Sequence, residues 1–277
     1  MILRAHAKVN VSLDVGGVRP DGYHELRTVY QSLALHDTLR FAHADEGFAV
    51  ACSAPGVPLH ERNLVWKAAE LVWAAAGRRG EPVGRVRITK RIPVQGGLGG
   101  GSADAAAALV GWNRLWTTRL SAERLRDLAR GLGADVPFFL WAGTALGVER
   151  GDEIHPLDDS PSRWVVLVFP PFGVSTPEAF RWWDEDHGRP PRIDSMPVFN
   201  DLEAPVARRH PELLEIRRAL EGAGAEAAAM TGSGSTVFGF FGTTSSARAA
   251  SDRLTLAGWR TMVTRTATRL QAGLLAG

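Results

Sequence analysis

The chain has 277 residues, of which 45% are hydrophobic and 22% are charged, and it carries a formal net charge of +2. This ordinary globular composition allows one large core or two domains, and so small a net charge gives no reason to expect nucleic acid or an anionic membrane as a partner. The lone Cys52 cannot form an internal disulfide, and no apolar run is long enough for a signal peptide or a membrane span, so we expect a cytoplasmic protein.

Hydrophobic patterning predicts that strands and helices alternate along the chain. The predicted strands cover residues 2–15, 29–35, 39–41, 85–89, 164–169, 237–241 and 261–266. The predicted helices cover residues 63–76, 103–116, 121–131, 212–220 and 247–257, with Asn63 and Ser121 as N-caps. A domain seam is expected near residues 156–162, and a polar, proline-rich stretch over 184–197 is expected to be an exposed insertion. This alternation indicates an α/β or α+β protein and argues against a helical bundle or a β-sandwich.

A glycine-rich loop is the most informative local feature. Residues 93–104 read P-V-Q-G-G-L-G-G-G-S-A-D, with five glycines between Gly96 and Gly101, and a helix-forming run follows at once. Glycine lets the backbone approach a ligand closely, and a helix start presents unpaired N–H groups that suit an anion such as phosphate. The spacing matches neither a P-loop nor a dinucleotide-binding motif. A tightly packed turn is the alternative.

Phosphoryl transfer also needs a cation, a group that takes the acceptor proton, and positive charge near the transition state. Ser102 can offer a hydroxyl to phosphate or Mg²⁺, or act as an N-cap. Asp135, in the turn G-A-D-V-P, can be a general base or a cap. Lys8 can pair with Asp135 and offset developing charge, or be a solvated strand-end lysine.

Lysine is scarce in this chain. Of the 32 basic residues, only Lys8, Lys67 and Lys90 are lysines. Lysine is a compact point charge with an adjustable pKa, whereas arginine is a planar fork that stays charged. The three lysines are therefore candidates for specific roles, although some lysines survive any compositional bias by chance.

Two further segments have open interpretations. Both tyrosines of the chain, Tyr23 and Tyr30, lie close to His24, and such a cluster can stack on and hydrogen-bond a base or can simply form a turn with core aromatics. The second glycine-containing loop, residues 231–236, can be an anion-binding nest or a tight turn.

Several of these segments together match one family. The matching segments, in chain order, are A-K-V-N (7–10), R-P-D-G-Y-H-E-L (19–26), N-L-V-W-K-A-A (63–69), K-R-I-P-V-Q-G-G-L-G-G-G-S-A-D-A-A (90–106), G-A-D-V-P-F-F (133–139), N-D-L-E (200–203) and T-G-S-G-S-T-V-F (231–238). The chain resembles the GHMP small-molecule kinases over nearly its whole length.

The resemblance implies an α+β (two-layer α/β) fold of two domains with the active site in the cleft between them. Residues 1–158 would form the N-terminal domain with the ATP phosphate loop, and residues 159–277 a C-terminal domain with a ferredoxin-like β-α layout. The implied reaction is ATP- and Mg²⁺-dependent phosphorylation of the 2-hydroxyl of 4-diphosphocytidyl-2-C-methyl-D-erythritol, in the non-mevalonate route to isoprenoid precursors. The alternatives are a mevalonate- or homoserine-type kinase, or a non-catalytic nucleotide- or RNA-binding module. We expect a monomer or weak homodimer that binds this small cytidine diphosphate-linked substrate and neither nucleic acid nor membranes.

The resemblance also assigns residues to roles. Lys8 and Asp135 fall at the catalytic pair, and Asn10 falls beside the reacting hydroxyl. The ATP-binding positions are Pro93, Val94, Gln95, Gly96, Gly97, Leu98, Gly99, Gly100, Gly101, Ser102 and Ala103 at the phosphates, with Asn63, Leu64, Lys67 and Lys90 toward the adenosine. The Mg²⁺ held with ATP would contact Ser102. The substrate positions, besides Asn10, are Tyr23, His24, Tyr30, Thr176 and Phe180.

Three departures from the family pattern stand out. His6 occupies a position where proline is usual, and we expect it to be structural. Tyr30 stands where phenylalanine is common, which keeps a stacking ring and adds a hydroxyl. The tract 181–195, with two tryptophans, matches poorly, so the substrate-side lid is not defined by the resemblance.

Overall fold

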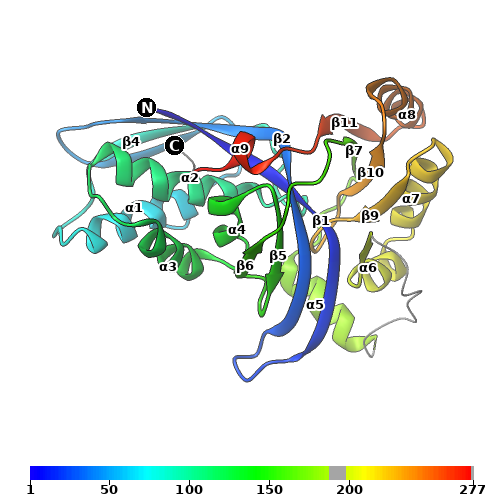
Figure 1. Cartoon of the computed structure of the whole chain (residues 1–277), viewed down its shortest axis with the longest axis horizontal. Helices are drawn as coiled ribbons and strands as arrows, with labels where there is room; N and C mark the ends of the chain where they lie inside the picture. Colours follow the sequence, from blue (N-terminus) through cyan, green and yellow to red (C-terminus); the bar gives the residue numbers. More distant parts are fainter. Residues whose placement is uncertain (187–197, 276–277) are drawn as a thin grey trace.

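The computed structural model describes residues 1–186 and 198–275, and Figure 1 shows their arrangement. Most of the stretch predicted to be an exposed insertion, 184–197, lies outside the described residues, as does the greater part of the poorly matching tract 181–195. In the described part of the chain, no helix is both long and apolar enough to cross a bilayer.

The N-terminal half is built on a strongly curved sheet. Its strand order is β3-β4-β2-β1-β8, and β5 adds to β2 and β6 to β5. The strands are β1 (Ile2–Val18), β2 (His24–Ala42), β3 (Phe48–Cys52), β4 (Gly84–Thr89), β5 (Thr144–Val148), β6 (Glu153–Pro156) and β8 (Phe199–Asn200). The two strands predicted over 29–35 and 39–41 are one strand, β2, because its antiparallel pairing with β1 runs from Ile2↔Arg40 to Val18↔His24.

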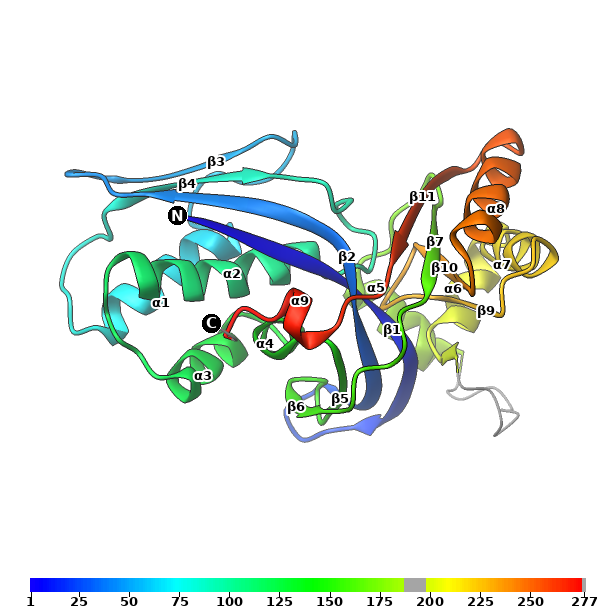
Figure 2. The same ribbon diagram turned by 45° about the horizontal axis from the view of Figure 1, so that its top comes forward.

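Four helices accompany this sheet: α1 (Leu64–Ala75), α2 (Gly100–Leu115), α3 (Ala122–Leu132) and α4 (Val136–Trp141). Both predicted N-caps are confirmed, since the Asn63 side chain accepts from the N–H of Val65 and that of Ser121 from Arg124. Helix α2 contacts β1, β2 and the other three helices, so it lies at the centre of the domain (Figure 2). Its buried run Ala105–Ala108 is fully inaccessible, because alanines let the helix pack closely on its neighbours.

The C-terminal half contains a four-stranded antiparallel sheet in the order β11-β7-β10-β9. Its strands are β7 (Trp164–Phe169), β9 (Ala227–Met230), β10 (Val237–Phe241) and β11 (Arg260–Arg265). The helices are α5 (Thr176–Glu185), α6 (Glu203–Arg209), α7 (Glu212–Gly222), α8 (Thr244–Leu256) and α9 (Arg269–Ala272). Helices α7 and α8 pack on this sheet, and with the four strands they make the β-α-β-β-α-β order of a ferredoxin-like layout.

The chain crosses between the two halves more than once. Strand β8 pairs in parallel with β1. Helix α9 packs back on β1 and β2, as Figures 1 and 2 both show. Leu274 joins the core that contains Trp112, and the Leu274 carbonyl accepts a hydrogen bond of 3.0 Å from the Arg114 guanidinium. A division of the chain at residues 158 and 159 stays a prediction, and the segment after β11 packs on the N-terminal half.

Candidate active site

The glycine-rich loop leads directly into the N-terminus of α2. The helix begins at Gly100, three residues earlier than predicted, and its N-cap is Gly99 in a left-handed conformation with φ of 69°. No side chain caps this helix start, so Ser102 lies inside the first turn and is not the N-cap. The first-turn N–H groups have no partner within the helix and are thus available to an anion, as the phosphate interpretation requires.

The second glycine-containing loop, 231–236, packs against the first. A Cβ atom on Gly97 would lie 2.2 Å from the carbonyl oxygen of Thr231, and one on Gly96 would lie 2.9 Å from Thr236 Oγ1. Asn200, at the end of β8, supports this loop by donating to the carbonyls of Met230 (2.9 Å) and Gly232 (2.7 Å). The two loops can therefore touch only because the contacting residues of the first are glycines.

Lys8 lies in the middle of β1 next to both loops. Its backbone N–H donates to the Leu98 carbonyl at 3.1 Å, which attaches the phosphate loop to the strand. Its ammonium group is almost fully buried, 2.6 Å from Asn10 Oδ1 and 3.3 Å from Asp135 Oδ2. Lys8 is thus not a solvated strand-end lysine. Asn10 shares its strand face, two residues on, and the Lys8 ammonium lies between Asn10 and Asp135, in contact with both.

Asp135 stands at the start of α4 but does not cap it with its side chain. The carboxylate is instead held by Lys8 at Oδ2 and by the Tyr30 hydroxyl, which donates to Oδ1 at 3.0 Å. About a third of the side chain, 32%, is exposed. The carboxylate is therefore accessible to a ligand on one side while protein groups hold it on the other.

The aromatic cluster forms a second region of the site. Tyr23 is 59% exposed, whereas His24 is buried beside Phe180, with 5.2 Å between the ring centroids of His24 and Phe180. His24 Nε2 lies 2.9 Å from Asp184 Oδ1, which fixes the imidazole. The Arg150 guanidinium lies over the Tyr23 ring at 5.3 Å. Residues of β2 and α5, far apart in sequence, thus meet at His24, which follows the exposed Tyr23 in the chain.

Tyr30 and Thr176 have surroundings that the sequence did not indicate. Tyr30 is only 2% exposed and its ring stacks on Phe138, 4.7 Å between centroids, so the structure does not present this ring as a platform for a base. Thr176, the first residue of α5, lies 3.2 Å from Ser233 through their hydroxyl oxygens. This contact connects α5 to the second loop.

On the expected nucleotide side, Asn63 already has protein partners. The Asn63 amide caps α1 and donates to the Pro58 carbonyl at 2.6 Å. In α1, Leu64 is half-buried and Lys67 exposed.

Lys90 is the cation of a buried cluster beneath the phosphate loop. Its ammonium lies 2.5 Å from Asp37 Oδ2 and 2.9 Å from Asp104 Oδ2. Burial raises the pKa of Asp104 to about 7, although Lys90 acts to lower it. Asp37 also accepts from the backbone N–H groups of Arg91 and Ile92. The cluster thus joins β2, the end of β4 and the first turns of α2.

Several residues that shape the site were not singled out from sequence. Asp37 and Asp184 hold Lys90 and His24, and Arg150 covers Tyr23. A charged residue inside the apolar pattern of β2 was the only signal for Asp37, whereas nothing local distinguishes Asp184 or Arg150. Asn200 lies in the matching N-D-L-E segment, but its contact with the second loop is visible only in the fold.

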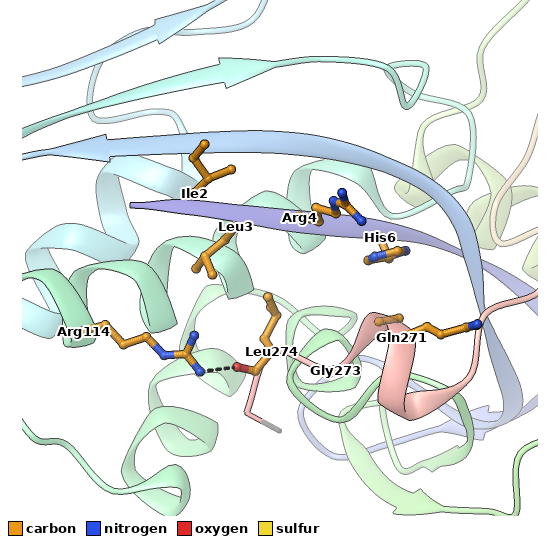
Figure 3. Close-up of a pocket in the computed structure, with 9 residues that line it drawn as sticks. Ile2, Leu3, Arg4, His6, Arg114, Gln271, Gly273 and Leu274 are labelled. Carbon is orange, nitrogen blue, oxygen red and sulfur yellow. Dashed lines mark hydrogen bonds between the residues drawn. The ribbon is translucent and has the colours of Figure 1, made fainter. Parts of the chain in front are cut away.

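His6 is buried next to backbone, in surroundings that fit the structural role expected for it. Its Nδ1 lies 2.8 Å from the Leu33 carbonyl oxygen, its ring is 5.1 Å from that of His36, and burial lowers its pKa. Figure 3 shows His6 at a pocket of about 390 Å³ near the start of β1, lined by Arg4, Arg114 and the segment Gln271–Leu274. None of the predicted site residues lines this pocket.

Comparisons with known proteins agree with this geometry. Residues 63–143 match the model of the GHMP kinases N terminal domain, and residues 192–258 match that of the GHMP kinases C terminal. The chain belongs to the GHMP kinase family. The matches cover the phosphate loop and Asp135 in the first half and the second loop in the other, so this GHMP kinase has the predicted fold class.

Individual relatives and solved structures show which members of the family the chain is similar to. This GHMP kinase is 43% identical to the 4-diphosphocytidyl-2-C-methyl-D-erythritol kinase of Pelotomaculum thermopropionicum, over 95% of this chain and 96% of the relative. It is 41% identical to the enzyme of that name from Moorella thermoacetica, over 96% and 99%. A crystal structure of 4-(cytidine 5'-diphospho)-2C-methyl-D-erythritol kinase superposes with a TM-score of 0.81 at 36% identity, covering 96% of this chain and 99% of the other. A mevalonate kinase, 12% identical with a TM-score of 0.72 and coverage of 97% and 99%, shares the fold.

Proposed function

We propose that this GHMP kinase transfers the γ-phosphoryl group of ATP to the 2-hydroxyl of 4-diphosphocytidyl-2-C-methyl-D-erythritol, in the non-mevalonate route to isoprenoid precursors. The observation that carries the proposal is the pair of the buried Lys8 with the partly exposed Asp135, beside an uncapped, glycine-rich helix start. The relatives that match nearly the whole chain bear the name of this enzyme. The kinase family itself implies ATP as co-substrate.

Asp135 is the proposed general base. Its exposed edge accepts the proton of the substrate hydroxyl as the hydroxyl oxygen attacks phosphorus. This is possible because protein groups hold the carboxylate on one side and leave the exposed side free to accept a hydrogen bond from the hydroxyl. Lys8 holds Oδ2 and offsets the negative charge that develops on the transferred group. The amide oxygen of Asn10 accepts a hydrogen bond from the Lys8 ammonium and so orients this cation within the site. These three side chains would therefore orient the hydroxyl and handle its proton.

The phosphate loop, residues 93–103, is proposed to hold the triphosphate. The geometry fits this role, since a Cβ on Gly101 would meet nothing within 4 Å and the first-turn amides of α2 are uncapped. Mg²⁺, when bound with ATP, would neutralise phosphate charge, and the Ser102 hydroxyl in the first turn is the side chain we assign to it. Asn63, Leu64 and Lys67 at the start of α1 would border the adenosine.

The aromatic region is proposed to bind the cytidine part of the substrate. The exposed Tyr23 side chain offers a stacking face, and the next residue, His24, packs against Phe180. Thr176 closes this side through its contact with the second loop. A mevalonate or homoserine substrate carries no base that would use such a surface. We accordingly favour the cytidine-linked alcohol over those two.

The decisive experiment measures ATP consumption by the purified protein with and without 4-diphosphocytidyl-2-C-methyl-D-erythritol. The proposal expects ADP formation that depends on this alcohol. Phosphorylation of mevalonate or homoserine with none of the cytidine substrate would refute the proposed substrate. Salt-sensitive RNA binding without ATP turnover would refute the enzyme assignment.

Two variants test the assigned roles. Asp135→Asn keeps the shape of the side chain, so ATP binding should remain nearly intact while kcat falls by roughly 100- to 10,000-fold. Lys8→Met should likewise lower kcat far more than it weakens ATP binding. Near wild-type kcat in either variant would remove that residue from the mechanism.

A further inference from the structure

The hydroxyl of Tyr30 is placed to act on the base. It lies 3.0 Å from Asp135 Oδ1 and 3.2 Å from the carbonyl oxygen of Gly151. A phenol has one proton to donate, and donation to a carboxylate is the stronger of the two because it is charge-assisted. Burial raises the pKa of Tyr30 well above 10, and the Asp135 charge raises it further. The hydroxyl therefore stays protonated and remains a donor.

The fold makes room for this hydroxyl specifically. A Cβ on Gly151 would lie 2.8 Å from the Tyr30 hydroxyl oxygen, and a Cβ on Gly147 would lie 2.6 Å from its ring. The ring also stacks on Phe138, which is in the helix that begins after Asp135. The ring and hydroxyl are thus fixed against the start of α4, where the carboxylate is located.

Lys8 and Tyr30 divide the carboxylate between them. Lys8 is on β1 and reaches Oδ2, whereas Tyr30 is on β2 and reaches Oδ1. With a donor at each oxygen, rotation of the carboxylate is restricted and its exposed edge keeps one direction. Lys8 alone would leave Oδ1 without this restraint from β2.

We propose that Tyr30 is a positioning residue, whose buried hydroxyl orients Asp135 for proton abstraction and which does not contact the cytidine. This inference rests on the proposed function, since it needs Asp135 as the base. It also changes the role expected for Tyr30, from a stacking ring in the substrate site to a hydrogen-bond donor behind the base.

Tyr30→Phe tests the inference, because it keeps the stacked ring and removes only the hydroxyl. Loss of a hydrogen bond to a charged group predicts a decrease in kcat of about 10- to 100-fold, with KM for ATP and for the cytidine substrate within about twofold of wild type. If Tyr30 instead stacked on the cytidine, its substitution would change KM for the cytidine substrate. Ser251→Ala is the matched control: its buried hydroxyl bonds Thr261 at 2.7 Å in the C-terminal half, and its loss should leave kcat unchanged.

The double variant Tyr30→Phe/Asp135→Asn separates positioning from general destabilisation. If Tyr30 acts through Asp135, the tyrosine change should add little to the loss already caused by Asp135→Asn.

Either of two results would overturn the inference: wild-type kcat in Tyr30→Phe, or an undiminished effect of that change in the Asp135→Asn background. The proposed function is judged separately, by the wild-type rate with the cytidine substrate. The ratio of variant to wild-type kcat, taken with whichever alcohol the wild type phosphorylates, judges the role of Tyr30.

Discussion

The contact between the two glycine-containing loops predicts that Gly97→Ala is severe and Gly101→Ala is not. At Gly97 a Cβ would lie 2.2 Å from the Thr231 carbonyl oxygen, whereas real Cβ contacts do not fall below 3.0 Å. The backbone there has φ of +71°, which costs an L-residue roughly 1–2 kcal/mol. Overpacking against backbone adds about 1–3 kcal/mol. We therefore expect a loss of roughly 2–5 kcal/mol, with the loops forced apart.

Gly101 is the matched position in the same segment. A Cβ there meets nothing within 4 Å, and alanine favours a helix over glycine by about 1 kcal/mol. Gly101→Ala should thus melt at or above the wild-type temperature. Its KM for ATP should nevertheless rise, because the methyl group would occupy space into which a phosphate must come.

Thermal unfolding and a coupled ADP assay measure both effects. Gly97→Ala should lower Tm by at least about 4 °C, from roughly 2 °C per kcal/mol for a chain of this size, and should also raise KM for ATP. Wild-type Tm and KM in Gly97→Ala would refute the reasoning from loop contact. An equal loss of Tm in Gly101→Ala would refute it as well.

Two further predictions concern stability. Gly111→Ala should lower the free energy of unfolding by about 1–3 kcal/mol, because its Cβ would lie 2.4 Å from the Phe41 ring. Gly131→Ala in α3 has open space around the new methyl group and should raise that free energy by about 0.5–1 kcal/mol. Urea denaturation of both variants checks this contrast, and equal effects would contradict it. Burial raises the pKa of Asp104 from 3.8 to about 7, so the folded state binds its proton more tightly than the unfolded chain does. The contribution of this group to stability therefore falls as pH rises from about 4 to 7 and then levels off. Asp104→Asn should lack this decline. Its free energy of unfolding should therefore increase relative to that of wild type as pH rises from 5 to 7.5. If that difference stays constant or decreases with pH, the assigned environment of Asp104 is contradicted.

Local sequence determined much of the secondary structure. The caps at Asn63 and Ser121 lie where predicted, as do the strands over 164–169 and 237–241. These features depend on hydrogen bonds and dihedral preferences within a few residues, which the sequence specifies directly. The helix start after the glycine loop was displaced by three residues, because Gly99 in a left-handed conformation can begin a helix without a side-chain cap.

The family motifs also predicted part of the active site, since Lys8 and Asp135 were expected to pair and do so. The local sequence could not separate a base from a cap at Asp135, nor a working lysine from a solvated one at Lys8. Those choices depend on which atoms lie nearby in space. For Asp135 and Lys8 they are decided by the contacts of the Asp135 carboxylate, whose Oδ2 meets Lys8 on β1 and whose Oδ1 meets Tyr30 on β2.

The roles of Tyr30 and Lys90 were decided by tertiary structure alone. Tyr30 pairs with Asn10 in the β1–β2 register, and a shift of one residue would turn its side chain to the other face of the sheet. Lys90 reaches Asp37 and Asp104 only because β2, β4 and α2 converge beneath the phosphate loop. Sequence by itself therefore determined many of the local elements and the family of this protein, whereas β3, β5, β6, α4 and α6 were not predicted. Strand register and helix packing decided which side chains meet, because side-chain direction is set by contacts between residues distant along the chain.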